Sequence, residues 1–415
     1  MLENGGGPNQ GNQDGVTTLM LACASGSEQT VQVLAENGNF TQGTNAGWNI
    51  LHFAALVDSA EVIRLCVDNS AQFQGNSQGI TPFHIAAEFG CVNAMKALAN
   101  HYPDNLMQRT GDDIGGLSPL DVAAKHGQNE IITLFNGKID SDKVNEGNKD
   151  SITPLHRAAQ NGHADSCAEL VKLGADPMRG NTGGNTPVHL AAEKGHYQAI
   201  KKIYEEHSGK LTFCGNSNDW NTPLHLACKN GHLNAAYYLI EKNSDSLKAK
   251  NKQEHTPLDL ACQFGSVPLV AMLLNKEAEC TDYVFESSVN HPDVMELMLC
   301  HFQTNATQDD LKVAVSAESK KSTELLLKCG ITPDEESIKT SAQKEDDSIL
   351  KLLVTWGAKI TQGTLNNSHE DHKQYLSGLL NQPPQTPPEE HLDYSEYEKS
   401  KLLGLYEDKL ASDLM

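Results

Sequence analysis

Short apolar blocks recur along this chain at a nearly constant spacing, and each block leads into a pair of small residues and a turn. The block at residues 222–232 reads "TPLHLACKNGH", and related blocks begin at residues 17, 49, 81, 118, 153, 186 and 256. Successive blocks start 32 to 37 residues apart. Self-similarity at such a period indicates a repeat protein in which each copy forms one supersecondary unit.

Each copy predicts a pair of short helices. Thr at the first position is a good N-cap, and Pro at the second suits the first helical residue. Paired small residues such as Ala158 and Ala159 make one face flat enough for close packing, and Gly162 suits the left-handed residue that ends the first helix. A second apolar segment follows, as in "CAELVKLGADP" (167–177). One such unit cannot bury its own apolar face, so we expect the units to stack.

The TPLH-x-AA-x-x-GH string and the G-A-D turn, repeated with a period of roughly 33 residues, resemble the ankyrin-repeat family. The resemblance covers eight copies over about residues 12–279. It implies an all-α fold, a solenoid of stacked helix–turn–helix units with β-hairpin-like fingers. It also implies that a protein partner binds on the concave face, which is made of the fingers and the first helices.

Three copies depart from this pattern. Met20, Asp121 and Asp259 stand where the other copies carry the His of TPLH. The connections at residues 101–117 and 136–152 are longer than the family spacing requires. We therefore expect irregular fingers in these two connections.

Three potential zinc ligands, His225, Cys228 and His232, lie within eight residues, and a thiol beside an imidazole can also become a nucleophile. Most other copies have Ala at the Cys228 position, which indicates a tight packing site that a thiol fills readily. The Gly-terminated turn separates His225 from His232. We therefore interpret the cluster as structural and expect no metal. The resemblance implies that the motif histidines bond near their own cap and the neighbouring unit; they are His52, His84, His156, His189 and His225.

Beyond residue 280 the TPLH string disappears, but segments that resemble the second helix continue, as in "STELLLKCGITP" (322–333). We expect degenerate, finger-free hairpins that extend the solenoid and cap it; an unrelated small helical domain is the alternative. The predicted organisation is a disordered leader at 1–11, eight repeats at 12–279, degenerate hairpins at 280–360, a Pro-rich linker at 361–393 and an acidic amphipathic tail at 394–415.

The charge balance restricts the partners. Asp and Glu outnumber Lys and Arg by 54 to 32, which gives a formal net charge of −22. Such a surface repels phosphate backbones, so we expect a protein partner, either basic or carrying an apolar anchor, and no nucleic acid. No apolar run approaches the ~18 residues that a membrane span requires. We also expect the chain to be a monomer.

The ten cysteines are scattered singly, with no CxxC pair and no secretory signal at the N-terminus. They are typical of reduced thiols, so we expect a cytoplasmic protein, with the nucleus as the alternative compartment. The sequence contains no GxSxG, HExxH, kinase or Walker A string. We therefore expect no enzymatic activity and no cofactor.

The resemblance also implies where a partner would bind, namely at the positions that vary between units in this family. These are finger residues, the residue before the capping Thr, and the pair after Ala-Ala. The candidates are Trp48, Leu56, Val57, Ile80, Phe89, Leu117, Lys125, Asp150, Lys194, Asp219, Lys229, Asn230 and Phe264. Trp48, Leu56, Phe89 and Leu117 could form one exposed apolar patch, and aromatic residues favour binding hot spots. The alternative is that several of them pack against the adjacent finger or helix.

Two functions follow from these observations. The first is a non-enzymatic scaffold that binds one partner on the concave face. The second is an adaptor, a regulatory subunit or a secreted effector, whose array recruits a substrate while the C-terminal segment recruits an enzyme or channel. The sequence does not identify the partner.

Overall fold

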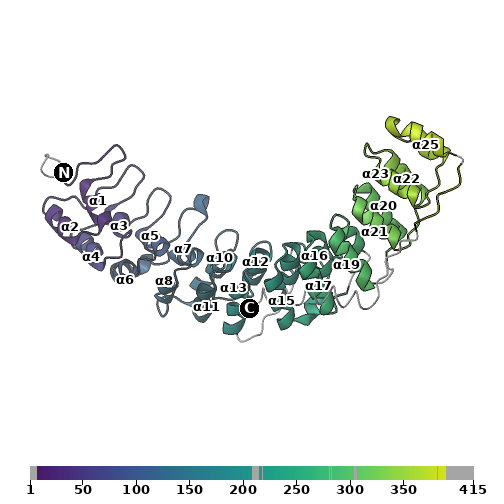
Figure 1. The fold of residues 1–415 in the computed structure, drawn as a ribbon. Coiled ribbons are helices and arrows are strands. Elements are labelled where there is room, and N and C mark those ends of the chain that lie inside the picture. Colours follow the sequence, from purple (N-terminus) through teal and green to yellow (C-terminus); the bar gives the residue numbers. More distant parts are fainter. Residues whose placement is uncertain are drawn as a thin grey trace. The chain divides into compact units, whose positions relative to one another are not determined.

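The computed structural model describes residues 7–207, 215–216, 218–279, 281, 283–302, 306–380 and 382–388. In these residues the regular structure is helical, apart from the isolated β-bridges Gly11–Thr17 and Gly43–Asn49. The described residues divide into two compact units, one ending near residue 207 and the other continuing from residue 219. Within each unit, helical pairs follow one another in chain order (Figure 1).

The N-terminal unit contains six helical pairs, which we number as repeats 1 to 6. They are α1 (Thr18–Ser25) with α2 (Glu28–Ala35), α3 (Ile50–Ala54) with α4 (Ala60–Asp68), α5 (Pro82–Phe89) with α6 (Val92–His101), α7 (Pro119–His126) with α8 (Asn129–Thr133), α10 (Pro154–Gln160) with α11 (Ala164–Lys172), and α12 (Pro187–Lys194) with α13 (Tyr197–Glu206). The first helices contact one another in the order α1, α3, α5, α7, α10 and α12, and the second helices stack in parallel order. The predicted stacking of the units is therefore present in the structure.

The second unit continues the same numbering with repeats 7 to 12. Its pairs are α14 (Pro223–Lys229) with α15 (Leu233–Lys242), α16 (Pro257–Phe264) with α17 (Val267–Asn275), α18 (Val284–Ser288) with α19 (Pro292–Phe302), α20 (Gln308–Ser316) with α21 (Lys320–Lys328), α22 (Glu335–Ala342) with α23 (Ser348–Thr355), and α24 (Gln362–Asn366) with α25 (Lys373–Leu379). From α16 to α24, first helices contact first helices, and from α15 to α23 second helices contact second helices. Residues 283–360 therefore stack in the way that the preceding repeats do.

Two predicted boundaries are wrong. The linker predicted at 361–393 instead holds α24 and α25 up to residue 379, because Thr361 caps α24 and Leu376 is fully buried. The predicted disordered leader at 1–11 extends too far, because Asn9 is already bonded to repeat 1. Its side-chain amide donates to the Asn37 carbonyl (2.9 Å) and accepts from the Asn39 N–H (2.6 Å). The predicted acidic tail at 394–415, like residues 1–6, lies outside the described residues.

The motif histidine links each helix start to the next repeat. In repeat 3, His84 Nδ1 accepts the Thr81 N–H (3.0 Å) and lies 2.8 Å from Thr81 Oγ1. Since Nδ1 accepts, Nε2 carries the proton and donates to the Leu117 carbonyl of repeat 4 (2.8 Å). His52 makes the equivalent bonds to Asn49 and to the Ile80 carbonyl. One side chain therefore closes a helix cap and ties two repeats together.

In repeat 4, Asp121 stands at the position of the motif histidine and makes a different set of contacts. Asp121 Oδ2 accepts from the Ser118 N–H (2.9 Å) and hydroxyl (2.7 Å), so the cap is preserved. A carboxylate cannot donate onward to a carbonyl. Instead it pairs with Arg109 (3.1 Å) and Arg157 (3.2 Å) inside the protein. Arg109 comes from the long connection at 101–117, so this insertion supplies a structural partner that the substitution requires.

The fingers that precede the first helices are turns held by backbone hydrogen bonds, and fingers 1, 2 and 3 lie at residues 12–16, 44–48 and 76–80. In finger 2 the Thr44 N–H donates to the Trp48 carbonyl (2.8 Å), which closes a turn at the tip. The Asn45 N–H donates to the Asp14 carbonyl of finger 1 (2.9 Å), and the Ser77 N–H of finger 3 donates to the Ala46 carbonyl (3.1 Å). Consecutive fingers are thus connected side by side without forming strands among the described residues.

The buried histidines predict a stability that falls in acid. Burial lowers the pKa of His84, His156 and His225 to about 4, from an ordinary value of 6.5. Between these values the unfolded chain binds more protons than the folded chain, so folding stability decreases as the pH falls from about 7 toward 4. Over this pH range we expect each histidine to lower the free energy of unfolding by about 1 to 3 kcal/mol. Urea unfolding followed by circular dichroism across this range would measure the slope. His84→Gln should make it shallower, and an unchanged slope would contradict the assignment.

Gly231 predicts a steric test of the stacking of repeats 7 and 8. Its φ is 74°, and a Cβ there would overlap the Phe264 ring of the next repeat. Gly330 also has a positive φ, 93°, but open space around it. We expect Gly330→Ala to cost about 1 kcal/mol through backbone strain alone, and Gly231→Ala about 2 to 4 kcal/mol. In urea unfolding, adding Phe264→Ala should recover part of the stability that Gly231→Ala loses. Equal losses for Gly231→Ala and Gly330→Ala would refute the proposed contact.

Candidate functional site

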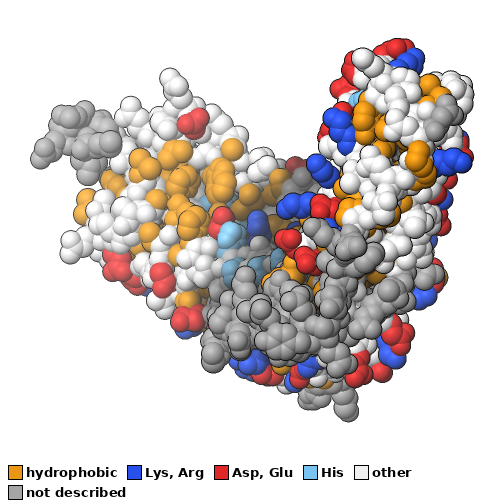
Figure 2. Space-filling view, turned by 45° about the vertical axis from the view of Figure 1, so that its right-hand side comes forward, with side chains coloured by type: hydrophobic (Ala, Val, Ile, Leu, Met, Phe, Trp, Pro, Cys, Tyr) orange, Lys and Arg blue, Asp and Glu red, His pale blue; other side chains and the backbone are white. Residues whose placement is uncertain are grey.

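A groove with a volume of about 560 Å³ lies in the N-terminal unit, between fingers 1 and 2 and the first helices α3 and α5. It is lined by Asp14, Val16, Thr44, Asn45, Ala46, Trp48, His52, Phe53, Leu56, Ile85, Glu88 and Phe89. Figure 2 shows apolar side chains gathered on the visible face of this unit, at the left of the view. The groove therefore combines residues from three consecutive repeats.

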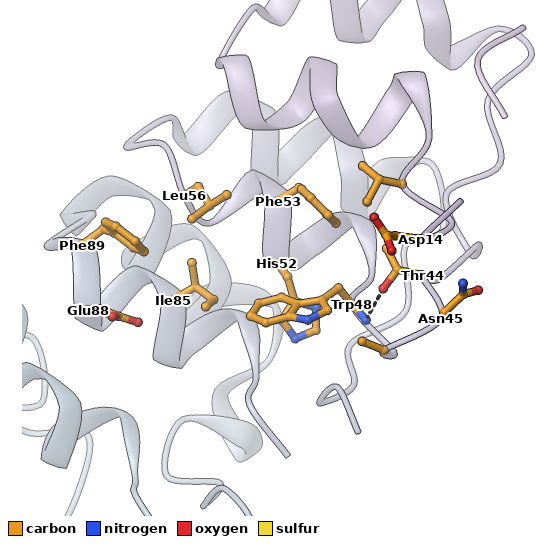
Figure 3. Close-up of a pocket in the computed structure, with 12 residues that line it drawn as sticks. Asp14, Thr44, Asn45, Trp48, His52, Phe53, Leu56, Ile85, Glu88 and Phe89 are labelled. Carbon is orange, nitrogen blue, oxygen red and sulfur yellow. Dashed lines mark hydrogen bonds between the residues drawn. The ribbon is translucent and has the colours of Figure 1, made fainter. Parts of the chain in front are cut away.

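The groove walls expose large apolar groups to water. Phe89 is 57 % exposed and Leu56 38 % exposed, whereas Ile85 beneath them is buried. Figure 3 shows Leu56, Phe53, Ile85 and Trp48 between Phe89 and the finger residues. Exposed aromatic and aliphatic groups that share one concave surface are typical of binding sites, because water solvates them poorly.

Trp48 is held in place by both its backbone and its ring. Its N–H donates to the Thr44 hydroxyl (3.0 Å), and its carbonyl accepts from the Thr44 N–H. The indole packs edge-on against His52 with ring centroids 5.1 Å apart. His52 is itself fixed by Asn49 and the Ile80 carbonyl. The half-buried indole is therefore presented to the groove with little freedom to rearrange.

The electrostatics of the groove are negative. Asp14 and Glu88 belong to the lining and are exposed. Burial lowers the pKa of His52 below 6.5, so its ring is neutral at physiological pH. The first basic residue of the sequence is Arg64, which pairs on α4 with Glu61 and Asp68. The lining itself contains no Lys or Arg.

The structure brings three of the predicted binding residues together in the groove, namely Trp48, Leu56 and Phe89. It separates Leu117 from them: Leu117 is half-buried and its carbonyl accepts the bond from His84. Of the four residues of the predicted patch, Leu117 is therefore the one that does not line this groove. Val57 lies beside Gly26 of repeat 1, as the packing alternative predicts. Ile80 is half-buried, and its carbonyl accepts the hydrogen bond from His52.

The remaining candidates lie outside the groove lining. The exposed ones are Lys125, Asp150, Lys194, Asp219, Lys229 and Phe264. Lys194 pairs with Glu193 (3.3 Å). Asn230 is partly buried and its amide donates to the Leu226 carbonyl (2.8 Å), so this side chain caps α14. Its prediction as a binding residue is weakened by that structural role.

The potential zinc ligands are engaged in the fold. His225 Nδ1 lies 2.8 Å from Thr222 Oγ1, and its Nε2 lies 3.0 Å from the His255 carbonyl. Cys228 is fully buried, and this burial raises the pKa of its thiol, which disfavours the thiolate that zinc or a substrate would need. Among the described residues no three His, Cys, Asp or Glu side chains are placed to hold a metal ion.

Sequence reasoning predicted only three of the twelve residues that line the groove as binding residues. Among those it missed, Phe53 and Ile85 directly follow the motif histidine, and Asp14 lies in the first finger. It also missed Trp220, which is 58 % exposed at a φ of 57°, and Tyr283, which is 48 % exposed. The available signal was the apolar residue directly after the motif histidine in repeats 2 and 3, Phe53 and Ile85.

No helix in the described part of the chain has the length and apolar character needed to cross a bilayer. A 78-residue stretch, 17 % of the chain, is 41 % identical to alpha-latrocrustotoxin-Lt1a of Latrodectus tredecimguttatus. The chain spans only 5 % of the length of that relative. A family model of ankyrin repeats matches residues 1–74, 68–143, 120–212 and 208–283. These matches cover the eight recurring blocks and the helical pairs of repeats 1 to 8, about two thirds of the chain, and the chain belongs to the ankyrin-repeat family.

Proposed function

We propose that this chain is a non-enzymatic scaffold that captures a protein partner in the groove of repeats 1 to 3. Ankyrin repeats generally mediate protein–protein interaction. The observation that carries the proposal is the joint exposure of Phe89 and Leu56 beside the fixed indole of Trp48. These side chains would gain by leaving water, and the rigid Trp48 would lose little conformational freedom on binding.

The groove favours one anchoring side chain over a flat contact. Its volume of about 560 Å³ falls in the range of pockets that enclose a small apolar group. A partner that inserts an aliphatic or aromatic side chain would cover the exposed parts of Leu56 and Phe89. The chain would act as a monomer. We place it in the cytoplasm or the nucleus, because its singly scattered cysteines are typical of reduced thiols.

An adaptor role is the second candidate, because the second unit carries its own exposed aromatic residues. Trp220 and Phe264 are 58 % and 48 % exposed, and Tyr283 packs against His255 with ring centroids 4.9 Å apart. If two partners are bound, Tyr283→Ala should release one of them and Phe89→Ala the other, in pull-downs with the full chain. Loss of the same partner from both variants would refute the adaptor role.

The scaffold proposal predicts the effect of removing the groove aromatics. Trp48→Ala and Phe89→Ala should each weaken binding tenfold or more, since such anchors contribute roughly 1 to 2 kcal/mol or more. Peptides would first be selected from a display library for binding to the full chain. Their affinity for the wild type and for each variant would then be measured by isothermal titration calorimetry. Val33→Ala is the matched control, because Val33 is 63 % exposed on α2 and does not line the groove.

The melting temperature separates binding from folding in the same variants. Both groove side chains are partly exposed, so we expect Phe89→Ala and Trp48→Ala to shift it little. A large drop in melting temperature with unchanged affinity would show that these aromatics serve packing, and the scaffold proposal would fail.

A further inference from the structure

Two carboxylates lie at opposite ends of the apolar lining of the groove. In Figure 3, Glu88 extends beside Phe89 at the left of the view, and Asp14 lies beside Thr44 at the right, with the apolar side chains between them. The two acids come from α5 and finger 1, two repeats apart. The groove thus has an apolar centre with one acidic group at each end.

The backbones of these two acids are fixed, whereas their carboxylates are not used by the fold. The Asp14 carbonyl accepts from the Asn45 N–H (2.9 Å), and the Glu88 carbonyl accepts from the Gln128 amide (3.0 Å). Both residues are exposed, and among the described residues neither carboxylate makes an ion pair or accepts a hydrogen bond. They are therefore available to a ligand without breaking an existing contact.

No basic side chain in this region compensates them. The first three repeats, residues 1–101, contain eight Asp and Glu residues and two Lys or Arg residues, Arg64 and Lys96; Lys96 lies on α6 and does not line the groove. Arg64 is held by Glu61 and by Asp68 (2.6 Å), all on α4, and none of the three lines the groove. The negative potential of the first three repeats is therefore left uncompensated at the groove.

We propose, building on the scaffold function above, that the occupant is a peptide segment with one apolar side chain flanked on both sides by Lys or Arg. The apolar side chain enters between Leu56, Phe89 and Trp48. The flanking cations meet Glu88 at one end and Asp14 at the other. Arg suits these positions best, because its guanidinium can bind a carboxylate through two parallel hydrogen bonds.

Charge complementarity distinguishes this occupant from the other candidates. An acidic segment would be repelled, and a neutral one would leave both carboxylates without a partner. A second copy of this chain carries the same net charge of −22, and residues 1–101 would meet their own excess of acids. A cationic segment with an apolar anchor satisfies both the walls and the ends of the groove.

The test uses the full chain and three fluorescein-labelled peptides of equal length, measured by fluorescence anisotropy. The first has a central Leu flanked by Arg, the second has the same Leu flanked by Gln, and the third has Ser in place of Leu between the Arg residues. The proteins are the wild type, the charge variant Asp14→Asn/Glu88→Gln, the apolar variant Trp48→Ala/Phe89→Ala, and Glu36→Gln. Glu36 is an exposed acid at the end of α2 that does not line the groove, so it controls for the general loss of negative charge.

We expect the Arg–Leu–Arg peptide to bind the wild type most tightly, and its affinity to fall as salt is raised. The charge variant should weaken that peptide by roughly twofold to fivefold for each carboxylate removed. It should bind the Gln-flanked peptide as the wild type does and should lose most of the salt dependence. Glu36→Gln should bind all three peptides like the wild type.

Failure of this inference differs from failure of the scaffold function. If the charge variant binds the Arg–Leu–Arg peptide as tightly as the wild type while the apolar variant does not, only the flanking cations are refuted. If the apolar variant also binds like the wild type, or if no peptide binds the wild type, both proposals fall. A dimer in sedimentation that Phe89→Ala dissolves would assign the groove to a second copy and overturn the inference.

Discussion

Each helical pair in the described part of the chain has an apolar face that its neighbours cover, and this constraint governs the rest of the structure. The small residues of the first helices, such as Ala86 and Ala87, are fully buried because the next repeat lies directly on them. The histidine bond from His84 to the Leu117 carbonyl crosses the same interface. Packing and polar contacts therefore act at the same junctions, and the stability of each repeat depends on its neighbours.

The groove exists because the stacking leaves certain positions free. The small pair of the first eight repeats is buried at the junctions, and the histidine bonds across the junction in several of them, whereas Leu56 and Phe89, which follow the small pair, are exposed. Large apolar groups at those positions cost solvation in the unbound chain. Repeats 2 and 3 bear that cost, while repeats 4 to 6 place Lys125 and Lys194 in the same register. The proposed binding residues therefore stand at positions that the repeat motif leaves free to vary.

The sequence predicted the fold closely because the fold is local and periodic. Helix starts, Thr caps and the stacking of units follow from a pattern that recurs eight times. The site was harder to predict, because its lining joins Asp14, Phe53 and Glu88 from three repeats. Only the three-dimensional stack shows that these side chains share one groove.

The errors have identifiable causes. Leu117 was predicted from its place in the register to belong to an exposed patch, but it is half-buried, and its carbonyl accepts the bond from His84 of the preceding repeat. The short helix α25 has a weak sequence signal, because Leu376 is its one buried side chain and a single apolar position gives no helical period. Periodicity predicts which elements form, and contacts between repeats decide which side chains remain accessible.

The distribution of thiols gives the molecule a further property. Cys66, Cys91, Cys167 and Cys228 lie in different repeats and all are buried. The hydrogen bond with Cys23, together with burial, raises the pKa of the Cys66 thiol, and burial raises the pKa of the other three. Only the thiolate reacts readily with alkylating reagents. Each cysteine therefore becomes reactive only when its own repeat opens. The chain consequently carries native probes of local opening, and their alkylation rates would map, repeat by repeat, how independently the units separate.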